Sequence, residues 1–214
     1  MELTAAAGWI TGVFSGFDYA LLSLYHTLAV TIGVVFTPFM KLVTYTGEHG
    51  YFLLASSFIL MIFKKTRRLG LCCFMAMAIG AVFTNLTIKG TVARPRPYDF
   101  SEEYRAWWMY TNGVLESGVY AFPSGHMTAA TAFSVSCVLI KGRKYLPWAA
   151  LYLLLMGMSR NYLMVHYPSD IIGGFIVGLV GAFAAYVIVL AAYKLLGDRI
   201  DNTLSVTLPE RKRQ

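Results

Sequence analysis

The chain alternates between long apolar stretches and short polar connections. Few charged side chains interrupt the apolar stretches, which is the pattern of membrane-spanning helices rather than of helices in a soluble domain. These stretches cover residues 19–40, 50–63, 69–88, 122–140, 146–163 and 169–193. We therefore predict an all-α, polytopic transmembrane helix bundle with six spans, with five spans as the alternative.

The first apolar stretch, 19–40, fits a span least well. Ser23, His26 and Pro38 interrupt it, so it either crosses the membrane or lies on the surface as an amphipathic helix; we favour a span. Residues 1–18 are predicted to form an N-terminal interfacial segment. They lack a basic region followed by a small-residue cleavage site, so we expect no removable signal peptide.

The composition supports a single membrane-embedded domain over residues 1–214. Of the 214 residues, 57% are hydrophobic and 14% charged, and the mean hydropathy is +0.58, too apolar for a soluble domain. Cys72, Cys73 and Cys137 lie in apolar stretches without the spacing of metal ligands, so they are interpreted as small core residues.

The net charge of +7 does not indicate a nucleic-acid partner, because most basic residues follow alternate apolar stretches. This is the distribution that the positive-inside rule gives cytoplasmic loops, so both termini are predicted on the cytoplasmic side, with 196–214 as a basic cytoplasmic tail. The residues concerned are Lys64, Lys65, Arg67, Arg68, Lys141, Arg143, Lys144, Lys194, Arg199, Arg211, Lys212 and Arg213.

The same topology places the other basic residues on the outer side, against the charge bias. They are Lys41, Lys89, Arg94, Arg96, Arg105 and Arg160. For Arg94 and Arg105, a side chain at the membrane rim is an equally good explanation. The presence of all these positive charges on the outer side nevertheless indicates a function.

Residues 159–170 bring an Arg, a His and an Asp to the edge of an apolar stretch, where ionisable groups are functional candidates. Pro168 suits the first turn of a helix, which would place Asp170 at the positive end of that helix. From there the carboxylate can hold one ring nitrogen of His166 and leave the other basic. The alternative is a capped helix start with an interfacial histidine.

A second group, Pro123-Ser124-Gly125-His126, lies at the start of the stretch 122–140, where its helix would begin. Exposed backbone N–H groups at a helix start bind anions, and His126 stands beside them to exchange a proton. Lys89, Arg96 and Arg160 would add fixed positive charge, and arginine pairs well with phosphate oxygens.

These three groups resemble the motifs of the type-2 phosphatidic acid phosphatase superfamily, which are K-x6-R-P, P-S-G-H and S-R-x5-H-x3-D. Lys89 to Pro97, Pro123 to His126, and Ser159 to Asp170 match them, and the resemblance runs from about residue 37 to 195. It implies a phosphatase core at 37–195 with the helical fold of acid phosphatases and vanadium haloperoxidases. Met164 departs from the small residue expected at its position.

The resemblance also implies roles at each matching position. His166 would be the nucleophile, oriented by Asp170, and His126 the general acid and then the base. Arg94 is placed behind these groups, and the aromatic connection 89–120 is either an interfacial belt, which we favour, or a lid over the substrate. The residues implied to bind phosphate are Lys89, Arg96, Ser124, Gly125 and Arg160, and those placed behind the site or in a substrate loop are Arg94, Pro97, Tyr98, Trp107 and Trp108.

The function expected from the resemblance is hydrolysis of a lipid phosphate at the outer face of a cytoplasmic membrane, without metal or other cofactor. Undecaprenyl diphosphate is the first choice of substrate, and phosphatidylglycerol phosphate or phosphatidic acid the alternative. Three further classes are a phosphotransferase using the same residues, a catalytically inactive scaffold and a vanadate-dependent halide oxidase. The presence of all the motif residues argues against the scaffold, and the membrane location argues against the oxidase.

Overall fold

The computed structural model of the chain describes residues 3–111, 113 and 118–203, without the side chains of 198 and 201–203. The elements there are helical, which confirms the predicted all-α class. In chain order the α-helices are α1 (Ala5–Thr46), α2 (Tyr51–Ile62), α3 (Lys64–Ala81), α4 (Lys89–Val92), α5 (Pro97–Phe100), α6 (Glu102–Tyr110), α7 (Gly125–Lys141), α8 (Leu146–Tyr162) and α9 (Pro168–Thr203).

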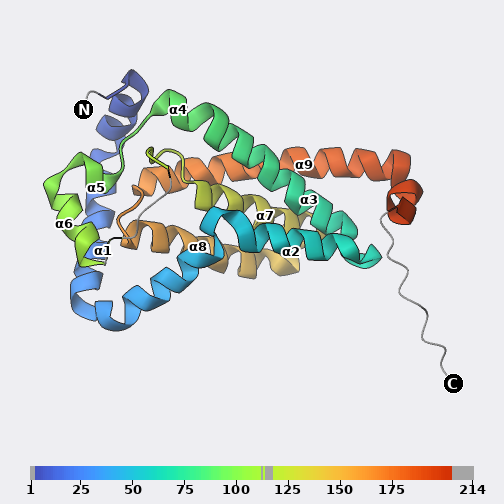
Figure 1. Cartoon of the computed structure of the whole chain (residues 1–214), viewed down its shortest axis with the longest axis horizontal. Helices are drawn as coiled ribbons and strands as arrows, with labels where there is room; N and C mark the ends of the chain where they lie inside the picture. The colour runs from blue at the N-terminus through green and yellow to red at the C-terminus, as the bar shows by residue number, and fades with distance from the viewer. Residues whose placement is uncertain (1–2, 112, 114–117, 204–214) are drawn as a thin grey trace.

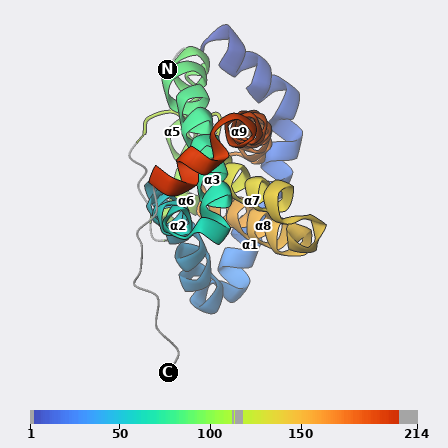
Figure 2. The same ribbon diagram turned by 90° about the vertical axis from the view of Figure 1, so that its right-hand side faces the viewer.

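The core is a bundle in which α9 packs against both α3 and α7, with α2 on α3 and α8 on α7. These helices run along the long axis of the molecule (Figures 1 and 2). A π-helix at Val82–Ile88 continues α3 into α4, so residues 64–92 form one long helix. A π-helical turn shifts the helix register, and it directs the residues that follow toward the end of the bundle.

Small residues on α9 allow the close approach to its neighbours. A Cβ added at Gly174 would lie 2.5 Å from the Ser124 carbonyl oxygen of α7, and one at Gly181 would lie 2.7 Å from the Ala76 oxygen of α3. Gly174, Gly178 and Ala182, which recur every four residues along α9, therefore form a packing surface.

Replacing Gly178 by alanine is expected to lower the free energy of unfolding by about 1–3 kcal/mol, because the site has no space for a methyl group. The new Cβ would lie 2.5 Å from the Thr131 Cβ and 2.7 Å from the Thr128 oxygen. Thermal unfolding in detergent, followed by circular dichroism, measures the change. Gly12→Ala is the matched control, since a Cβ there meets nothing within 4 Å. Equal Tm values for the two variants would contradict the prediction.

Helix α1 is a single helix of 42 residues and does not separate the predicted segments 1–18 and 19–40. It crosses one end of the bundle rather than running along it (Figures 1 and 2). Its C-terminal half is fixed to the end of α8, where the Ser159 hydroxyl donates to the Met40 oxygen at 2.8 Å. The placement of residues 19–40 relative to the membrane remains a prediction.

Three helical stretches are long and apolar enough to cross a membrane within the described part of the chain: Ala5–Ile62, Lys64–Val92 and Pro168–Gly197. Helices α7 and α8 have 17 residues each, the short end of the range for a span. The count of six spans remains a prediction.

The basic stretch 64–68, predicted as a loop, forms the first turns of α3. Phe63 alone, with an extended backbone, joins α2 to α3. Arg67 is buried, and its guanidinium donates to the Met61 oxygen at 2.9 Å and the Ile62 oxygen at 3.1 Å. It therefore satisfies carbonyls at the end of α2, which lets the turn be this short. The end of the predicted tail, 204–214, lies outside the described residues.

Candidate active site

His166 lies in the short connection between α8 and α9. Helix α9 begins at Pro168 with Asp170 in its first turn, which confirms the predicted helix start. The Asp170 Oδ2 accepts from the Tyr167 N–H at 2.8 Å and lies 3.5 Å from the Nδ1 of His166. Both side chains are almost fully buried, so the carboxylate is held rigidly beside one nitrogen of the imidazole.

The connection that carries His166 turns sharply at Met164, whose φ is +56°. A residue with a Cβ rarely adopts this left-handed conformation, at a cost of about 1–2 kcal/mol. Met164 is fully buried in a cluster with Leu22 and Tyr167, and this packing holds the strained turn. The sequence had marked this position as one where a small residue was expected.

Arg96 connects three segments around the imidazole. Its Nε donates to the Gly118 oxygen at 2.8 Å and its Nη1 to the Val165 oxygen at 2.9 Å. The same Nη1 lies 3.4 Å from the Nε2 of His166. Arg160, fully buried in the last turn of α8, donates to the Thr44 hydroxyl of α1. The Arg96 guanidinium is therefore fixed beside the imidazole of His166, and the Arg160 guanidinium is held between α8 and α1.

The start of α7 faces the same region. The Ser124 side chain caps the helix by accepting from the Met127 N–H at 3.4 Å. Its own N–H donates to the Asp170 oxygen at 3.1 Å, which ties the start of α7 to the first turn of α9. Gly125 begins the helix, and a Cβ there would meet no atom within 4 Å. The positive end of α7 is therefore open on this side.

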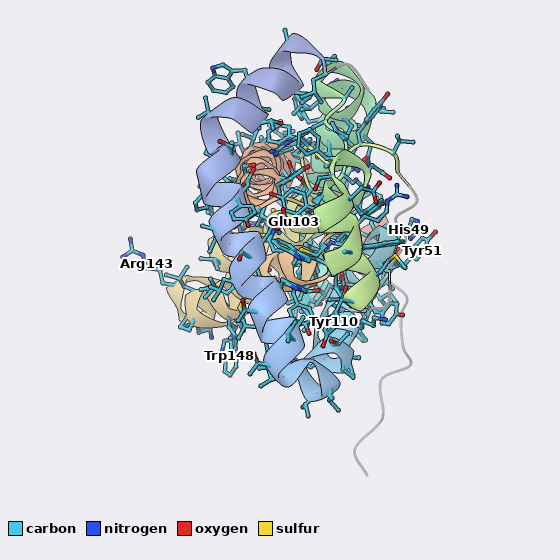
Figure 3. All side chains as sticks on the ribbon, turned by 90° about the vertical axis from the view of Figure 1, so that its left-hand side faces the viewer. His49, Tyr51, Glu103, Tyr110, Arg143 and Trp148 are labelled. Atoms are coloured by element: carbon cyan, nitrogen blue, oxygen red, sulfur yellow. The ribbon has the colours of Figure 1, made fainter. Side chains whose placement is uncertain are left out.

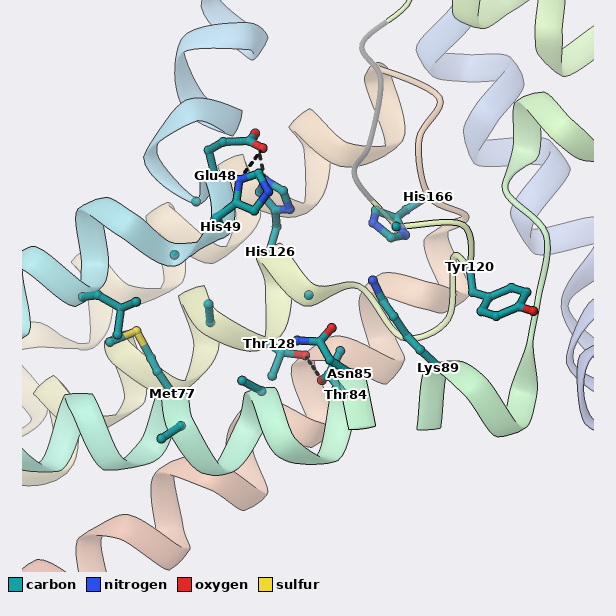
Figure 4. Close-up of a pocket in the computed structure, with 18 of the residues that line it drawn as sticks. Glu48, His49, Met77, Thr84, Asn85, Lys89, Tyr120, His126, Thr128 and His166 are labelled. Atoms are coloured by element: carbon teal, nitrogen blue, oxygen red, sulfur yellow. Dashed lines mark hydrogen bonds and ion pairs between the residues drawn. The ribbon is translucent and has the colours of Figure 1, made fainter. Parts of the chain in front are cut away.

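One cavity of about 830 Å³ brings residues from the three motifs together. Lys89, Arg96, His126 and His166 line it, together with Gly125, which directly precedes His126 in the chain. Figure 4 shows the imidazoles of His126 and His166 and the amine of Lys89 facing the same space. Away from these groups the cavity is lined by Leu54, Met77, Ala78, Ala81 and Ala129 of α2, α3 and α7.

The electrostatics of this cavity keep His166 uncharged. Burial lowers the pKa of His166 well below 6.5, and the positive charges of Arg96, Arg160, Lys89 and His126 lower it further. A neutral imidazole with one nitrogen next to a carboxylate is able to act as a nucleophile.

Several residues assigned to a substrate loop do not reach the cavity. Pro97 begins α5, and Tyr98 packs on Trp108 at 4.8 Å between ring centres. Trp107 stacks on His26 of α1 at 4.8 Å. Figure 3 shows α6 beside α1 across this end of the molecule. These aromatic side chains pack within and between α1, α5 and α6 and do not line the cavity.

Three residues at the site come from α1 and the turn after it, outside the motifs. Glu48 places its Oε2 3.5 Å from the Nε2 of His126 and its Oε1 3.0 Å from the Nδ1 of His49 (Figure 4). Thr44 accepts from Arg160, and Asp18 reaches Arg94. The sequence analysis did not single out Asp18. In the described residues, no group of three His, Cys, Asp or Glu side chains could hold a metal ion.

The sequence matches the model of the PAP2 superfamily over residues 69–194. An undecaprenyl-diphosphatase of Sulfolobus acidocaldarius is 26% identical over 169 residues, covering 76% of this chain and 74% of that protein. A lipid A 1-phosphatase of Rhizobium etli is 29% identical over 137 residues, 64% of this chain and 57% of that protein.

The fold is similar to that of a solved structure, a transmembrane PAP2-type phosphatidylglycerolphosphate phosphatase of Bacillus subtilis. The TM-score is 0.63 at 23% identity, and the match covers 97% of this chain and 94% of that one.

Proposed function

The chain belongs to the PAP2 superfamily of membrane lipid phosphatases, and we propose that it hydrolyses the phosphate or diphosphate of an amphiphilic lipid through a phosphohistidine. The observation that carries this proposal is the single cavity in which His166 and His126 face each other beside Lys89 and Arg96. Phosphoryl transfer needs mainly positioning and positive charge, and this cavity supplies both.

In the proposed first step, the Nε2 of His166 attacks phosphorus while the bond to the leaving oxygen breaks. Protonated His126 gives its proton to that oxygen, and the nearby Glu48 carboxylate favours the protonated imidazole. Asp170 stabilises the charge that His166 acquires. In the second step, water gives a proton to His126 and attacks phosphorus, and the phosphorus–nitrogen bond breaks.

We propose undecaprenyl diphosphate as the substrate, with phosphatidylglycerol phosphate or phosphatidic acid as alternatives. The cationic end of the cavity fits phosphate, and its apolar walls fit the first carbons of a hydrocarbon tail. The name of the Sulfolobus relative supports the first choice. The lipid A phosphatase among the relatives adds a further substrate to test.

We propose that the cavity opens on the outer side of a cytoplasmic membrane. The segments that carry Lys89, His126 and His166, which are α4, the start of α7 and the α8–α9 connection, lie at the end of the bundle opposite to the α2–α3 and α7–α8 connections (Figure 1). The residues in and directly beside those connections include Lys64, Lys65, Lys141, Arg143 and Lys144, which the positive-inside rule assigns to the cytoplasm.

Phosphate release by the detergent-purified protein, in EDTA, tests the function. The substrates are undecaprenyl diphosphate, phosphatidylglycerol phosphate, phosphatidic acid, lysophosphatidic acid and lipid A. Release that persists in EDTA is expected, with undecaprenyl diphosphate fastest. Release from none of them, with or without an added acceptor lipid, would overturn the proposal; transfer of labelled phosphate to an acceptor would make the protein a phosphotransferase.

The pH dependence of kcat/KM is expected to be bell-shaped, because His166 must be neutral and His126 protonated in the free enzyme. Since burial and nearby cations lower the pKa of His166, the rise on the acid side is expected below about pH 6.5, the usual histidine value. The fall at higher pH follows deprotonation of His126. A flat profile between about pH 4 and pH 9 would contradict both roles.

A further inference from the structure

Asp18 is a buried carboxylate in the middle of α1, with 2% of its surface exposed. It lies outside the matched region 69–194 and outside the three motifs. A buried charge is costly unless it is paired and hydrogen-bonded, so its partners indicate why it is there.

The partner of Asp18 is Arg94, which bridges two carboxylates. The Arg94 Nη2 donates to the Asp18 Oδ2 at 2.8 Å, and its Nη1 donates to the Asp170 Oδ1 at 2.7 Å. Both carboxylates and the guanidinium are at most 3% exposed. The guanidinium also lies 3.8 Å over the ring of Tyr167, so its position is fixed from several sides.

Ser169 closes this network at the start of α9. Its N–H donates to the Asp18 Oδ1 at 2.9 Å and its hydroxyl to the Asp18 Oδ2 at 2.7 Å. The hydroxyl oxygen accepts from the Arg94 Nη1 at 2.7 Å. Asp18 therefore ties α1 directly to the first turn of α9, one residue before Asp170.

The charges of this network bear on His166. Arg94 carries one positive charge and contacts two negative ones, so the buried cluster keeps a net negative charge beside the imidazole. Without the charge of Asp18, the guanidinium would neutralise Asp170 alone. Asp170 would then stabilise a positively charged imidazole less well, and four cations oppose that charge from the other side: Lys89, Arg96, His126 and Arg160.

We propose that Asp18 is a positioning residue of the reaction, which offsets the charge of Arg94 so that Asp170 remains an effective negative partner of His166. The inference rests on the proposed function for its kinetic consequence, but the electrostatic coupling of Asp18 to His166 stands without it. The other titratable groups near Asp18 are Tyr104 and Tyr167, which stay neutral through the working pH range because burial raises the pKa of each.

Asp18→Asn keeps the shape and removes the charge. We expect kcat to fall by about tenfold or more with KM changed less than about threefold, because the phosphate-binding residues are untouched. The acid limb of kcat/KM should move to lower pH, because the protonated form of His166 loses stabilisation. Thr11→Val is the matched control: it removes a neutral acceptor of the Arg94 Nε at 3.3 Å and leaves all charges in place.

A second variant separates charge from structure. In Asp18→Asn with Arg94→Gln, the guanidinium charge is also gone, so the net charge beside His166 returns to its original value. The titration of His166, followed by NMR of histidine-labelled protein and assigned with His166→Ala, should move to lower pH in the single variant. It should return toward the wild-type midpoint in the double variant.

The outcomes are distinct for the two proposals. A wild type without phosphatase activity, with the His166 titration shifted as described, would overturn the proposed function and leave the coupling in place. An active wild type whose kcat, pH profile and His166 titration are unchanged in Asp18→Asn would overturn the role of Asp18. The role of Asp18 would also be overturned if Thr11→Val reproduced the whole effect, or if Asp18→Asn changed only the Tm.

Discussion

Replacing His166 by alanine is expected to lower kcat for lipid phosphate hydrolysis by at least about a thousandfold, because the variant lacks the imidazole on which the proposed covalent intermediate forms. His166 sits with its Nδ1 3.5 Å from Asp170 and its Nε2 3.4 Å from Arg96, so one nitrogen is oriented and the other faces the phosphate-binding groups. Phosphate release under saturating substrate measures the loss.

Two further measurements identify the lost step as nucleophilic attack. Wild-type protein quenched during turnover with labelled substrate should carry an acid-labile, base-stable phosphoryl group, and the His166→Ala protein should carry none. Added imidazole should restore part of the activity of the variant, because the truncated side chain enlarges a cavity of about 830 Å³. Residual activity above about a tenth of wild type would contradict the assignment.

His26→Ala is the matched control for this prediction. That imidazole stacks on Trp107 between α1 and α6 and does not line the cavity. We expect its activity to stay within about threefold of wild type, the size of effect typical of a packing change away from the chemistry.

The local relations at the site could be predicted from the sequence. Pro168 fixed the start of α9, and the four-residue spacing of His166 and Asp170 placed the carboxylate under the imidazole. The motif order also predicted that Lys89, Arg96, His126 and His166 would meet, and the structure brings them to one cavity. Their catalytic roles remain proposals, which the variants test.

The long-range contacts could not be predicted in this way. Asp18 and Ser169 are 151 residues apart, and Arg160 and Thr44 are 116 apart. Hydrophobic periodicity places a residue on one face of its own helix but does not say which distant segment covers that face. The sequence left open whether residues 19–40 span the membrane or lie on its surface, and the crossing of the bundle end by α1 is what brings Asp18 and Thr44 to the site.

The role of Arg94 shows the same limit. The spacing of the K-x6-R-P motif selects Arg96 and leaves Arg94 two positions away, which is why it was placed behind the site. The structure gives it two buried carboxylates as partners. The motif therefore identifies the arginine that lies beside His166, while the charge balance around Arg94 depends on Asp18, an acid that no motif contains.

Replacing His126 by asparagine is expected to lower kcat/KM by an amount that depends on the leaving group of the substrate, unlike the loss of His166. If His126 protonates the leaving oxygen, its removal should lower kcat/KM by about 10²- to 10⁴-fold for an alkyl phosphate, whose leaving alkoxide is strongly basic. A nitrophenyl phosphate with the same hydrocarbon tail leaves without needing a proton, so the loss on that substrate should be much smaller.

The comparison of the two substrates tests the role of His126 directly, with His166→Ala as the reference. Loss of the nucleophile should affect both substrates to a similar degree, because no phosphoryl-enzyme forms from either. In His126→Asn, the nitrophenyl substrate should also give a burst of one nitrophenol per active site, since the water that cleaves the phosphohistidine has lost its base. Equal losses on both substrates in His126→Asn, without a burst, would show that His126 binds phosphate but transfers no proton.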